Sequence, residues 1–270
     1  DFGVGTEVCF FGSDTARHLR QEYGSAKIVL AANVICHMPD LNDLGEGLDL
    51  LLASDGLFIF EEPYLGSMIE RVSYDQIYDE HVYIFSALSV RNIFEPLGFE
   101  LVDLLPQKTH GGSMRYVLAR KGVLPVSKAV ASIFEAEFMQ NLHSLDTCIA
   151  FASACEASKE RLVDALMNER SAGRRVVGYG ATSKSTTILN YCDIGPQLID
   201  YICDTSATKQ GKFSPGMHIP IRPHETFSKE PPPTALLLAW NHSKEILAKE
   251  RTFTEAGGKW LTHLQAVENG

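Results

Sequence analysis

The tetrapeptide Tyr78-Asp79-Glu80-His81 combines the residue types that proton transfer requires. A histidine gains and loses a proton near neutral pH, and a neighbouring carboxylate can orient its ring and raise its basicity. Tyr78 and His81 are three positions apart, so one helical turn would place both on the same face. The phenol could then donate to a developing oxyanion while the imidazole abstracts a proton. The alternative is a solvated, acidic helix end before the apolar stretch 82–85.

Two further polar residues, Asn33 and His37, follow the apolar run 27–32. Such a run without alternation is typical of a parallel strand that is buried on both faces. Ligands of doubly wound sheets bind beyond the carboxyl ends of the strands, so Asn33 is a candidate for contact with a cofactor or substrate. In the alternative interpretation, Asn33 caps the next element and His37 belongs to a surface loop.

His110-Gly111-Gly112-Ser113 lies between two predicted strands, 99–104 and 114–119. A close pair of strands with a glycine-rich connection predicts an antiparallel hairpin. The first of these strands should run parallel to the rest of the sheet, which places the loop at the carboxyl edge, alongside Asn33. The two glycines permit close backbone approach or positive φ, although a plain hairpin loop explains them equally well.

The octapeptide GYGATSKS at 178–185 joins a predicted strand to a predicted helix. Backbone amides at a helix start, with the ammonium of Lys184 and the hydroxyls of Thr182 and Ser183, suit a diphosphate. The pattern is only GxG, so the dinucleotide fingerprint is incomplete. A structural turn is the alternative.

Asp204 stands at the end of the next predicted strand, where an acidic residue often binds a ribose hydroxyl. Lys209 opens the stretch KQGKFSPG (209–216), whose two lysines could close over phosphates. The alternative for this stretch is a solvated surface loop.

The elements that must position these residues alternate between strands and helices. The first half of the chain predicts strands at 7–11, 27–32, 57–61, 99–104 and 114–119, helices at 14–22, 43–53 and 89–97, and a turn at 54–56. The second half predicts strands at 174–179, 198–203, 234–240 and 259–264, and helices at 183–191 and 244–253. A helical stretch, 127–171, separates the two halves and has a possible break near His143.

This order predicts an α/β protein in three parts. Residues 1–122 form a Rossmann-like domain whose layout, a mainly parallel sheet closed by a hairpin, resembles that of class I methyltransferases. Residues 123–172 form a helical connector, and residues 173–270 form a second Rossmann-like α/β domain.

Composition excludes several classes of protein. A net charge of −10 argues against nucleic-acid binding, which needs a clustered basic surface. The longest apolar runs are far shorter than the about 20 residues of a membrane helix, and no leader pattern indicates secretion. The six cysteines form no CxxC pair, so their spacing shows no metal ligand set, and they are interpreted as reduced thiols of a cytoplasmic protein.

Taken together, these segments resemble the sugar C-methyltransferases of deoxysugar pathways, in which a nucleotide-linked 4-keto sugar receives a methyl group on carbon. The matching strings occur in order over nearly the whole chain: AANV with His37, YDQIYDEH, THGGSMRY, GYGATSKS with Asn190, DTSATKQGKFSPG and LLLAWNH. The match is therefore much more specific than any single motif.

The resemblance implies S-adenosylmethionine as cofactor and a nucleotide sugar, dTDP-linked, as substrate. By this likeness His81 is the general base that forms an enolate, and Tyr78, Glu80 and His37 are its neighbours in the site. The cofactor would be flanked by Asn33, Ala32 and Phe11. The substrate would be met by His110, Thr182, Ser183, Lys184, Asn190, Asp204, Lys209 and Asn241.

The sequence departs from the family at its beginning. The family's cysteine-rich zinc module and the first strand with its glycine-rich cofactor loop have no counterpart, so an N-terminally truncated sequence is expected. Two other functions stay open: a nicotinamide-dependent nucleotide-sugar oxidoreductase or epimerase, suggested by the Gly178 loop and Asp204, and a non-catalytic fragment that binds a nucleotide sugar.

Overall fold

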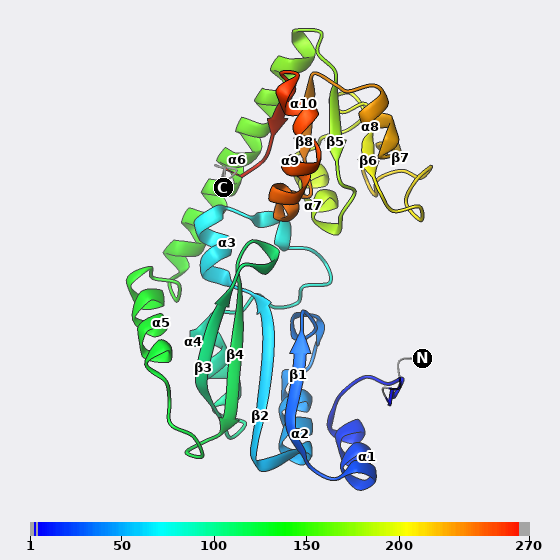
Figure 1. Cartoon of the computed structure of the whole chain (residues 1–270). Helices are drawn as coiled ribbons and strands as arrows, with labels where there is room; N and C mark the ends of the chain where they lie inside the picture. Colours follow the sequence, from blue (N-terminus) through cyan, green and yellow to red (C-terminus); the bar gives the residue numbers. More distant parts are fainter. Residues whose placement is uncertain (1–2, 4, 265–270) are drawn as a thin grey trace. The chain divides into compact units, whose positions relative to one another are not determined.

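The computed structural model describes residue 3 and residues 5–264, and it divides the chain into two compact α/β units (Figure 1). The first unit comprises residues 1–67 and 80–144, and the second comprises residues 68–79 and 145–270. The chain therefore leaves the first unit, contributes one short segment to the second, and returns before it completes the first.

The sheet of the first unit has the strand order β1-β2-β4-β3. Its strands are β1 (Ala26–Ala32), β2 (Leu52–Pro63), β3 (Phe99–Gln107) and β4 (Ser113–Arg120). β1 and β2 are parallel, whereas β4 is antiparallel to both β2 and β3. The predicted hairpin is thus confirmed. Because Ser113 pairs with both Pro63 and Gln107, the hairpin loop lies at the carboxyl edge of the sheet.

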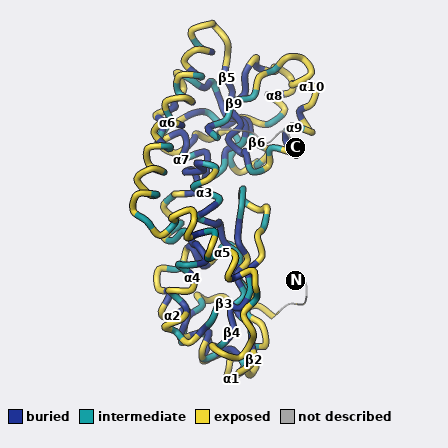
Figure 2. The backbone as a smooth tube through the Cα atoms, turned by 90° about the vertical axis from the view of Figure 1, so that its left-hand side faces the viewer, coloured by how far each residue is buried: buried dark blue, intermediate teal, exposed yellow. Residues whose placement is uncertain are grey.

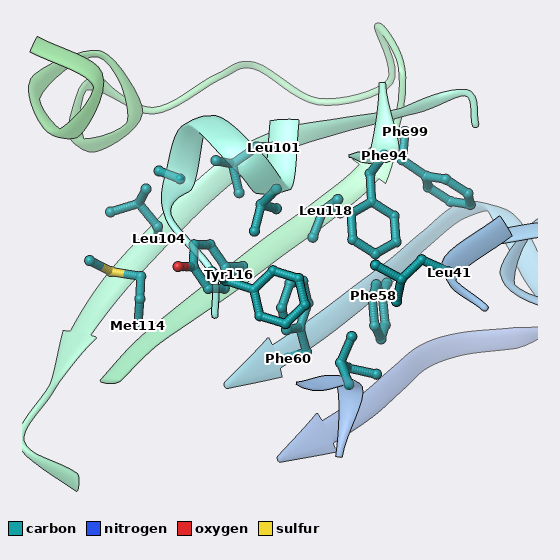
Figure 3. Close-up of a cluster of buried hydrophobic side chains, with 14 of the residues drawn as sticks. Leu41, Phe58, Phe60, Phe94, Phe99, Leu101, Leu104, Met114, Tyr116 and Leu118 are labelled. Carbon is teal, nitrogen blue, oxygen red and sulfur yellow. The ribbon is translucent and has the colours of Figure 1, made fainter. Parts of the chain in front are cut away.

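The helices of the first unit are α1 (Ser13–Tyr23), α2 (Leu41–Leu51), α4 (Ala87–Phe94) and α5 (Lys128–Met139), with the short helices η1 (Ile35–His37) and η3 (Thr109–Gly111). Two of them, α2 and α4, begin at residues whose side chains accept from the free amide groups of the first turn. The Asp40 side chain accepts from two backbone N–H groups of α2, and Ser86 forms a capping box with Ser89 at α4. Figure 3 shows the core beneath them, where Phe58 and Phe60 of β2 pack against Phe94 of α4.

Three expectations for the first unit are wrong. Residues 7–11 form no strand, since Val8 and Phe10 are almost fully exposed and no pairing partner lies beside them among the described residues. β1 is not buried on both faces either, because its Leu30 is 72% exposed. In the described part of the chain it is an edge strand that pairs with β2 alone. It has one open face, and its residues alternate between partly buried and exposed. The uninterrupted apolar run 27–32 gives no sign of this alternation. The predicted turn at 54–56 instead lies within β2, at an irregular register.

The second unit contains a five-stranded parallel sheet of order β7-β6-β5-β8-β9. Its strands are β5 (Val176–Tyr179), β6 (Ile202–Asp204), β7 (Ile221–Pro223), β8 (Thr234–Leu237) and β9 (Lys259–Leu261). Its helices are α6 (Leu145–Ser171), α7 (Ser183–Tyr191), α8 (Glu225–Lys229), α9 (Ser243–Lys249) and α10 (Arg251–Glu255), with η4 (Trp240–His242) and η2 (Tyr74–Gln76). The strand order reverses between β5 and β8, which is where doubly wound sheets bind ligands. Figure 2 shows the buried backbone of β5 and β6, whereas the edge strands β7 and β9 are mostly exposed or intermediate.

The predicted helical stretch is interrupted near His143, as expected, between α5 and α6. These two helices do not form a connector of their own, because α5 belongs to the first unit and α6 to the second. α3 (Leu65–Arg71), which the sequence did not predict, leads from the first unit into the segment 68–79. Within the described ranges no helix has both the length and the apolar character needed to cross a membrane.

Candidate functional site

A buried carboxylate organises the carboxyl edge of the first sheet. Glu62, near the end of β2, is fully buried, and its Oε1 accepts hydrogen bonds from three successive backbone N–H groups. The donors are Val34, Ile35 and Cys36, at 2.9, 2.7 and 3.2 Å. These are the amides that the start of η1 leaves unsatisfied, so Glu62 fixes the path of the chain from Asn33 to His37. The sequence analysis did not identify Glu62.

Two buried acceptor atoms at this edge have no hydrogen-bond partner among the described residues, Asn33 Oδ1 and Glu62 Oε2. The backbone N–H of Asn33 donates to the carbonyl of Glu61. Asn33 itself adopts a left-handed backbone conformation with φ of 53°. Buried polar atoms are normally satisfied by protein, water or ligand. Asn33 therefore offers an acceptor to a ligand that carries N–H or O–H donors.

His37 and His81 lie together beside this edge, with ring centroids 5.1 Å apart. His37 Nδ1 is 2.6 Å from the backbone oxygen of Glu80, which can only accept, so Nδ1 carries the proton and Nε2 the lone pair. The expected helical turn at 78–81 is absent, because η2 ends at Gln76 and a turn follows at 79–80. Tyr78 lies in the segment 68–79 of the second unit, whereas Glu80 and His81 belong to the first.

Burial and the adjacent Glu62 carboxylate raise the pKa of the Cys36 thiol far above its ordinary value. Cys36 is therefore a protonated thiol beside His37 in the protein without ligands.

The hairpin loop is attached to the same edge through Glu61. Glu61 accepts from Thr109 Oγ1 at 2.7 Å and from the Arg115 guanidinium at 2.8 Å. His110 has a left-handed φ of 52°, and Gly112 has φ of 128°, where a Cβ would lie 2.5 Å from Ser67. Gly112 is therefore required by the backbone and by close packing, and it brings His110 to the edge as the sequence predicts.

A cavity of about 480 Å³ opens on the exposed face of β1 and β2. It is lined by Leu30, Ala31, Ala32, Ile59, Phe60, Glu61 and Arg115. The small side chains of Ala31 and Ala32 leave room, and the Glu61 carboxylate supplies acceptor atoms. These features fit a ligand such as S-adenosylmethionine, which carries amino and hydroxyl donors. Asn33, which follows β1, is not among the lining residues. Phe11 is half-buried and packs against the core of the first unit.

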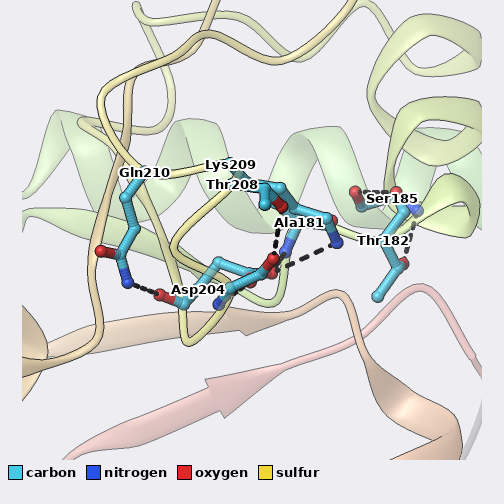
Figure 4. Close-up of polar contacts among 8 residues, drawn as sticks. Ala181, Thr182, Ser185, Asp204, Thr208, Lys209 and Gln210 are labelled. Carbon is cyan, nitrogen blue, oxygen red and sulfur yellow. Dashed lines mark hydrogen bonds and ion pairs between the residues drawn. The ribbon is translucent and has the colours of Figure 1, made fainter.

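Asp204 joins two loops at the carboxyl edge of the second sheet (Figure 4). Its Oδ2 accepts from the Ala181 N–H and its Oδ1 from the Ser206 N–H, both at 2.7 Å. Lys209 Nζ lies 3.8 Å from the same carboxylate and donates to the Ala181 carbonyl at 2.6 Å. Thr182 caps α7 by accepting from the Ser185 N–H at 3.1 Å. Asp204 therefore braces the loop that a diphosphate would meet, in addition to any contact with a ribose.

These residues surround a cavity of about 400 Å³ at the point where the strand order reverses. Its lining brings together the predicted Thr182, Asp204 and Lys209 with residues that the sequence did not single out, among them Tyr179, His224, His242 and Lys249. Glu250 is buried and accepts from the Tyr179 hydroxyl at 2.9 Å, while His224 Nε2 lies 2.7 Å away. The cavity wall is therefore fixed by hydrogen bonds, and burial beside Glu250 raises the pKa of Tyr179.

Four of the substrate residues predicted within the second unit do not line this cavity, and His110 belongs to the first unit. Ser183 is exposed at the start of α7, and Asn241 lies in η4. Asn190 donates to the carbonyls of Thr186 and Pro215, which ties α7 to the 205–220 loop. Lys184 is only 8% exposed, and its ammonium lies 4.9 Å from the centroid of the Trp240 ring. Burial lowers the pKa of Lys184, which is the environment of a packed cation rather than of a solvent-facing phosphate clamp.

A buried polar cluster holds the segment 68–79 within the second unit. Asp75 is fully buried, and its Oδ2 accepts from the Trp240 indole N–H at 2.6 Å while His263 Nε2 lies 3.2 Å from Oδ1. Tyr74 stacks edge-on against His263, and its hydroxyl lies 3.4 Å from Cys192 Sγ. Three of the strings quoted above, those with Asp75, Lys184 and Trp240, thus meet in one cluster. Their common role is to anchor the segment 68–79, which contains Tyr78.

Comparisons with known proteins give consistent matches along the chain. A sequence model of the C-methyltransferase C-terminal domain matches residues 108–264, and a model of the methyltransferase domain matches residues 5–104. The chain is 34% identical over 262 residues to the C-methyltransferase NovU of Streptomyces niveus. This alignment covers 97% of the chain but 62% of the relative's length.

The solved structures that match the chain include two methyltransferases. One is a SAM-dependent methyltransferase from Anabaena variabilis ATCC 29413, with 17% identity and a TM-score of 0.32, covering 41% of this chain and 56% of that one. The other is the N-methyltransferase NodS from Bradyrhizobium japonicum WM9, with 15% identity and a TM-score of 0.25, covering 35% of this chain and 50% of that one.

Proposed function

The chain belongs to the C-methyltransferase family, and we propose that it takes part in S-adenosylmethionine-dependent methylation of a carbon atom in a nucleotide-linked 4-keto deoxysugar. The observation that carries this proposal is the pair His37 and His81 at the carboxyl edge of the first sheet, with a defined tautomer at His37. NovU is named as a C-methyltransferase, and the chain shares a third of its residues with it.

In the proposed mechanism His81 removes the proton from the carbon next to the sugar ketone. The resulting carbanion is stabilised as an enolate, and Tyr78 steadies the enolate oxygen by donating a hydrogen bond to it. His37 is a further group of the site, beside His81. When bound, S-adenosylmethionine supplies an electrophilic methyl group to which the enolate carbon is the nucleophile. Alignment of the reacting atoms is worth about 7–11 kcal/mol of barrier, and one well-placed oxyanion donor about 3–4 kcal/mol.

Asn33, Ala32 and Phe11 are proposed to flank the cofactor. The free acceptor at Asn33 Oδ1 and the cavity over Ala31 and Ala32 support this assignment. His110 is proposed to meet the sugar from the hairpin loop, and Glu80 holds His37 in register through its backbone carbonyl.

The nucleotide part, dTDP by family likeness, is proposed to occupy the cavity of the second unit. Thr182, Asp204 and Lys209 line that cavity, and Lys209, Lys249 and His242 supply it with groups that suit phosphate oxygens. The alternative, a nicotinamide dinucleotide at the same loop, is less well supported because the loop carries only GxG and not the complete GxGxxG fingerprint.

The decisive experiment separates proton removal from methyl transfer. In the complete protein that the gene encodes, His81→Asn is expected to lower both methyl transfer and solvent-deuterium exchange at the reacting carbon by roughly 10²–10⁴-fold. His18→Asn, a change at an exposed histidine of α1, is the matched control and leaves both rates unchanged. Exchange that persists in His81→Asn would assign the base to another residue.

A further inference from the structure

Cys36, His37 and His81 form a cluster whose possible ligand atoms all lie within 4.8 Å of one another. All three belong to the first unit, although His81 is 45 or 44 positions away from the other two in the sequence. The spacing of the cysteines shows no metal ligand set, whereas the fold creates one. We propose that these three side chains bind a single divalent cation of the zinc type.

The ligand chemistry selects the class of metal. One thiolate and two imidazoles are ligands that Zn²⁺ prefers, whereas Mg²⁺ and Ca²⁺ require mainly oxygen ligands. Three protein ligands leave a fourth tetrahedral position open, as in zinc sites that also bind water or a substrate. When the cation binds, the Cys36 S–H bond breaks, the sulfur becomes the ligand, and the proton passes to solvent.

The positions of two of the ligands are already fixed without metal. His37 Nδ1 donates to the Glu80 carbonyl at 2.6 Å, which leaves Nε2 as the nitrogen available to a cation. Metal-binding histidines commonly use the other ring N–H in this way. The backbone N–H of Cys36 is held by Glu62, so η1 presents the thiol and the imidazole from one rigid turn. The His81 ring lies 5.1 Å from that of His37.

Occupation of this site has a consequence for the proposed function. A cation bound to His81 engages the imidazole that is proposed to abstract the proton, so zinc would inhibit the reaction. Metal binding itself does not depend on that proposal, and the two are tested separately.

Cobalt is the probe for binding, because a thiolate bound to Co²⁺ gives a near-ultraviolet charge-transfer band. Titration of the 270-residue chain with Co²⁺ is expected to produce this band with one equivalent bound, and Zn²⁺ is expected to displace it. Cys36→Ser should abolish the band and weaken Zn²⁺ binding by at least about 10-fold. His37→Ala changes an exposed residue, so it should weaken metal binding without a change in folding. Loss of binding in this variant therefore tests the site even if Cys36→Ser folds poorly.

The matched controls are Cys148→Ser, which removes an exposed thiol, and His18→Ala, which breaks the second group of possible ligands at Glu7, His18 and Glu22. Both are expected to retain the band at full intensity. A band that survives Cys36→Ser, or no saturable Co²⁺ binding at all, would overturn the proposal.

Inhibition is then measured as methyl transfer in the presence of micromolar-range Zn²⁺. Cys36→Ser is expected to lose most of its sensitivity to Zn²⁺, with its rate in Zn²⁺ compared with the rate of the same variant without Zn²⁺. If Co²⁺ binds at Cys36 but Zn²⁺ does not inhibit, the metal site stands and the assignment of His81 as the base fails. If His81→Asn abolishes the reaction but no metal binds, the assignment of His81 as the base stands and the metal site fails.

Discussion

In both units a carboxylate holds a loop at the carboxyl edge of the sheet, but the two loops carry different functional groups. In each, a carboxylate near the end of a strand accepts backbone N–H groups from a neighbouring loop, Glu62 in the first unit and Asp204 in the second. Glu62 is completely buried, and the loop it holds presents imidazoles. Asp204 lines a cavity, and the loop it holds presents hydroxyl, amide and ammonium groups. The first edge is suited to proton transfer and the second to binding.

The largest effect is expected from removal of the buried carboxylate in the first unit. Glu62→Ala leaves three backbone N–H groups buried without their acceptor, and we expect a loss of about 3–5 kcal/mol in the free energy of unfolding. Glu62→Gln keeps a carbonyl oxygen in the same place and should recover more than half of that loss. Urea denaturation, with circular dichroism as the readout, measures both values.

Asp204→Ala is the corresponding change in the second unit. It removes two acceptors from a partly exposed loop brace, so the expected cost is only about 1–2 kcal/mol. Equal losses of unfolding free energy for Glu62→Ala and Asp204→Ala would contradict the expectation that the more deeply buried carboxylate contributes more to stability.

A second prediction concerns the anchor of segment 68–79. Asp75→Ala deprives the Trp240 indole and His263 of their buried acceptor, and we expect a loss of about 2–4 kcal/mol in stability of the second unit. Asp75→Asn retains one acceptor and should cost less than half as much. Native-state hydrogen exchange at residues 68–79 tests this, and protection that is unchanged in Asp75→Ala would refute the role of the cluster as an anchor.

A third prediction concerns the acid sensitivity of the second unit. Glu169 at the end of α6 is nearly buried and bonds to Arg174, Lys259 and Thr234, which lower its pKa to about 2. Because the folded pKa lies below that of the unfolded chain, the stabilisation is complete above about pH 5 and is lost as pH falls towards 2. Its size is about 2 kcal/mol, reduced from the full linkage value since both cations face solvent.

The measurement is the free energy of unfolding at pH 7 and at pH 3, compared between the protein and Glu169→Gln. The variant should be less stable at pH 7, and the difference should shrink at pH 3. Glu95, which pairs with Lys121 on the surface, provides the control, because Glu95→Gln should have almost no effect at either pH.

The sequence predicts much of the framework and less of the site. Helix 183–191 was predicted at its observed bounds, and the hairpin and the break near His143 were confirmed, because local periodicity and turn residues encode them. The strand at 7–11 and the burial of β1 were wrong, since both depend on which strands stand beside them.

Glu62 and Asp75 could not be found from sequence for a related reason. In the sequence Glu62 only follows the predicted strand 57–61, and the backbone N–H groups that bond to it lie 26 to 28 positions away. Asp75 meets Trp240 and His263 across 165 and 188 positions. Lys184 was assigned to phosphate by its motif, but only the fold shows that its ammonium packs over Trp240. Long-range hydrogen bonds of this kind leave no periodic signal in the sequence.

The central claim is that the first edge serves proton transfer and the second edge serves substrate binding. It is tested most directly by separate measurement of kcat and KM for methyl transfer to a nucleotide-linked 4-keto deoxysugar. His37→Asn, at the first edge, is predicted to lower kcat by roughly 10²-fold or more while KM stays within about 2-fold. Lys209→Met, at the second edge, is predicted to raise KM about 10-fold with kcat retained. A fall in kcat with Lys209→Met, or a change in KM alone with His37→Asn, would contradict the account.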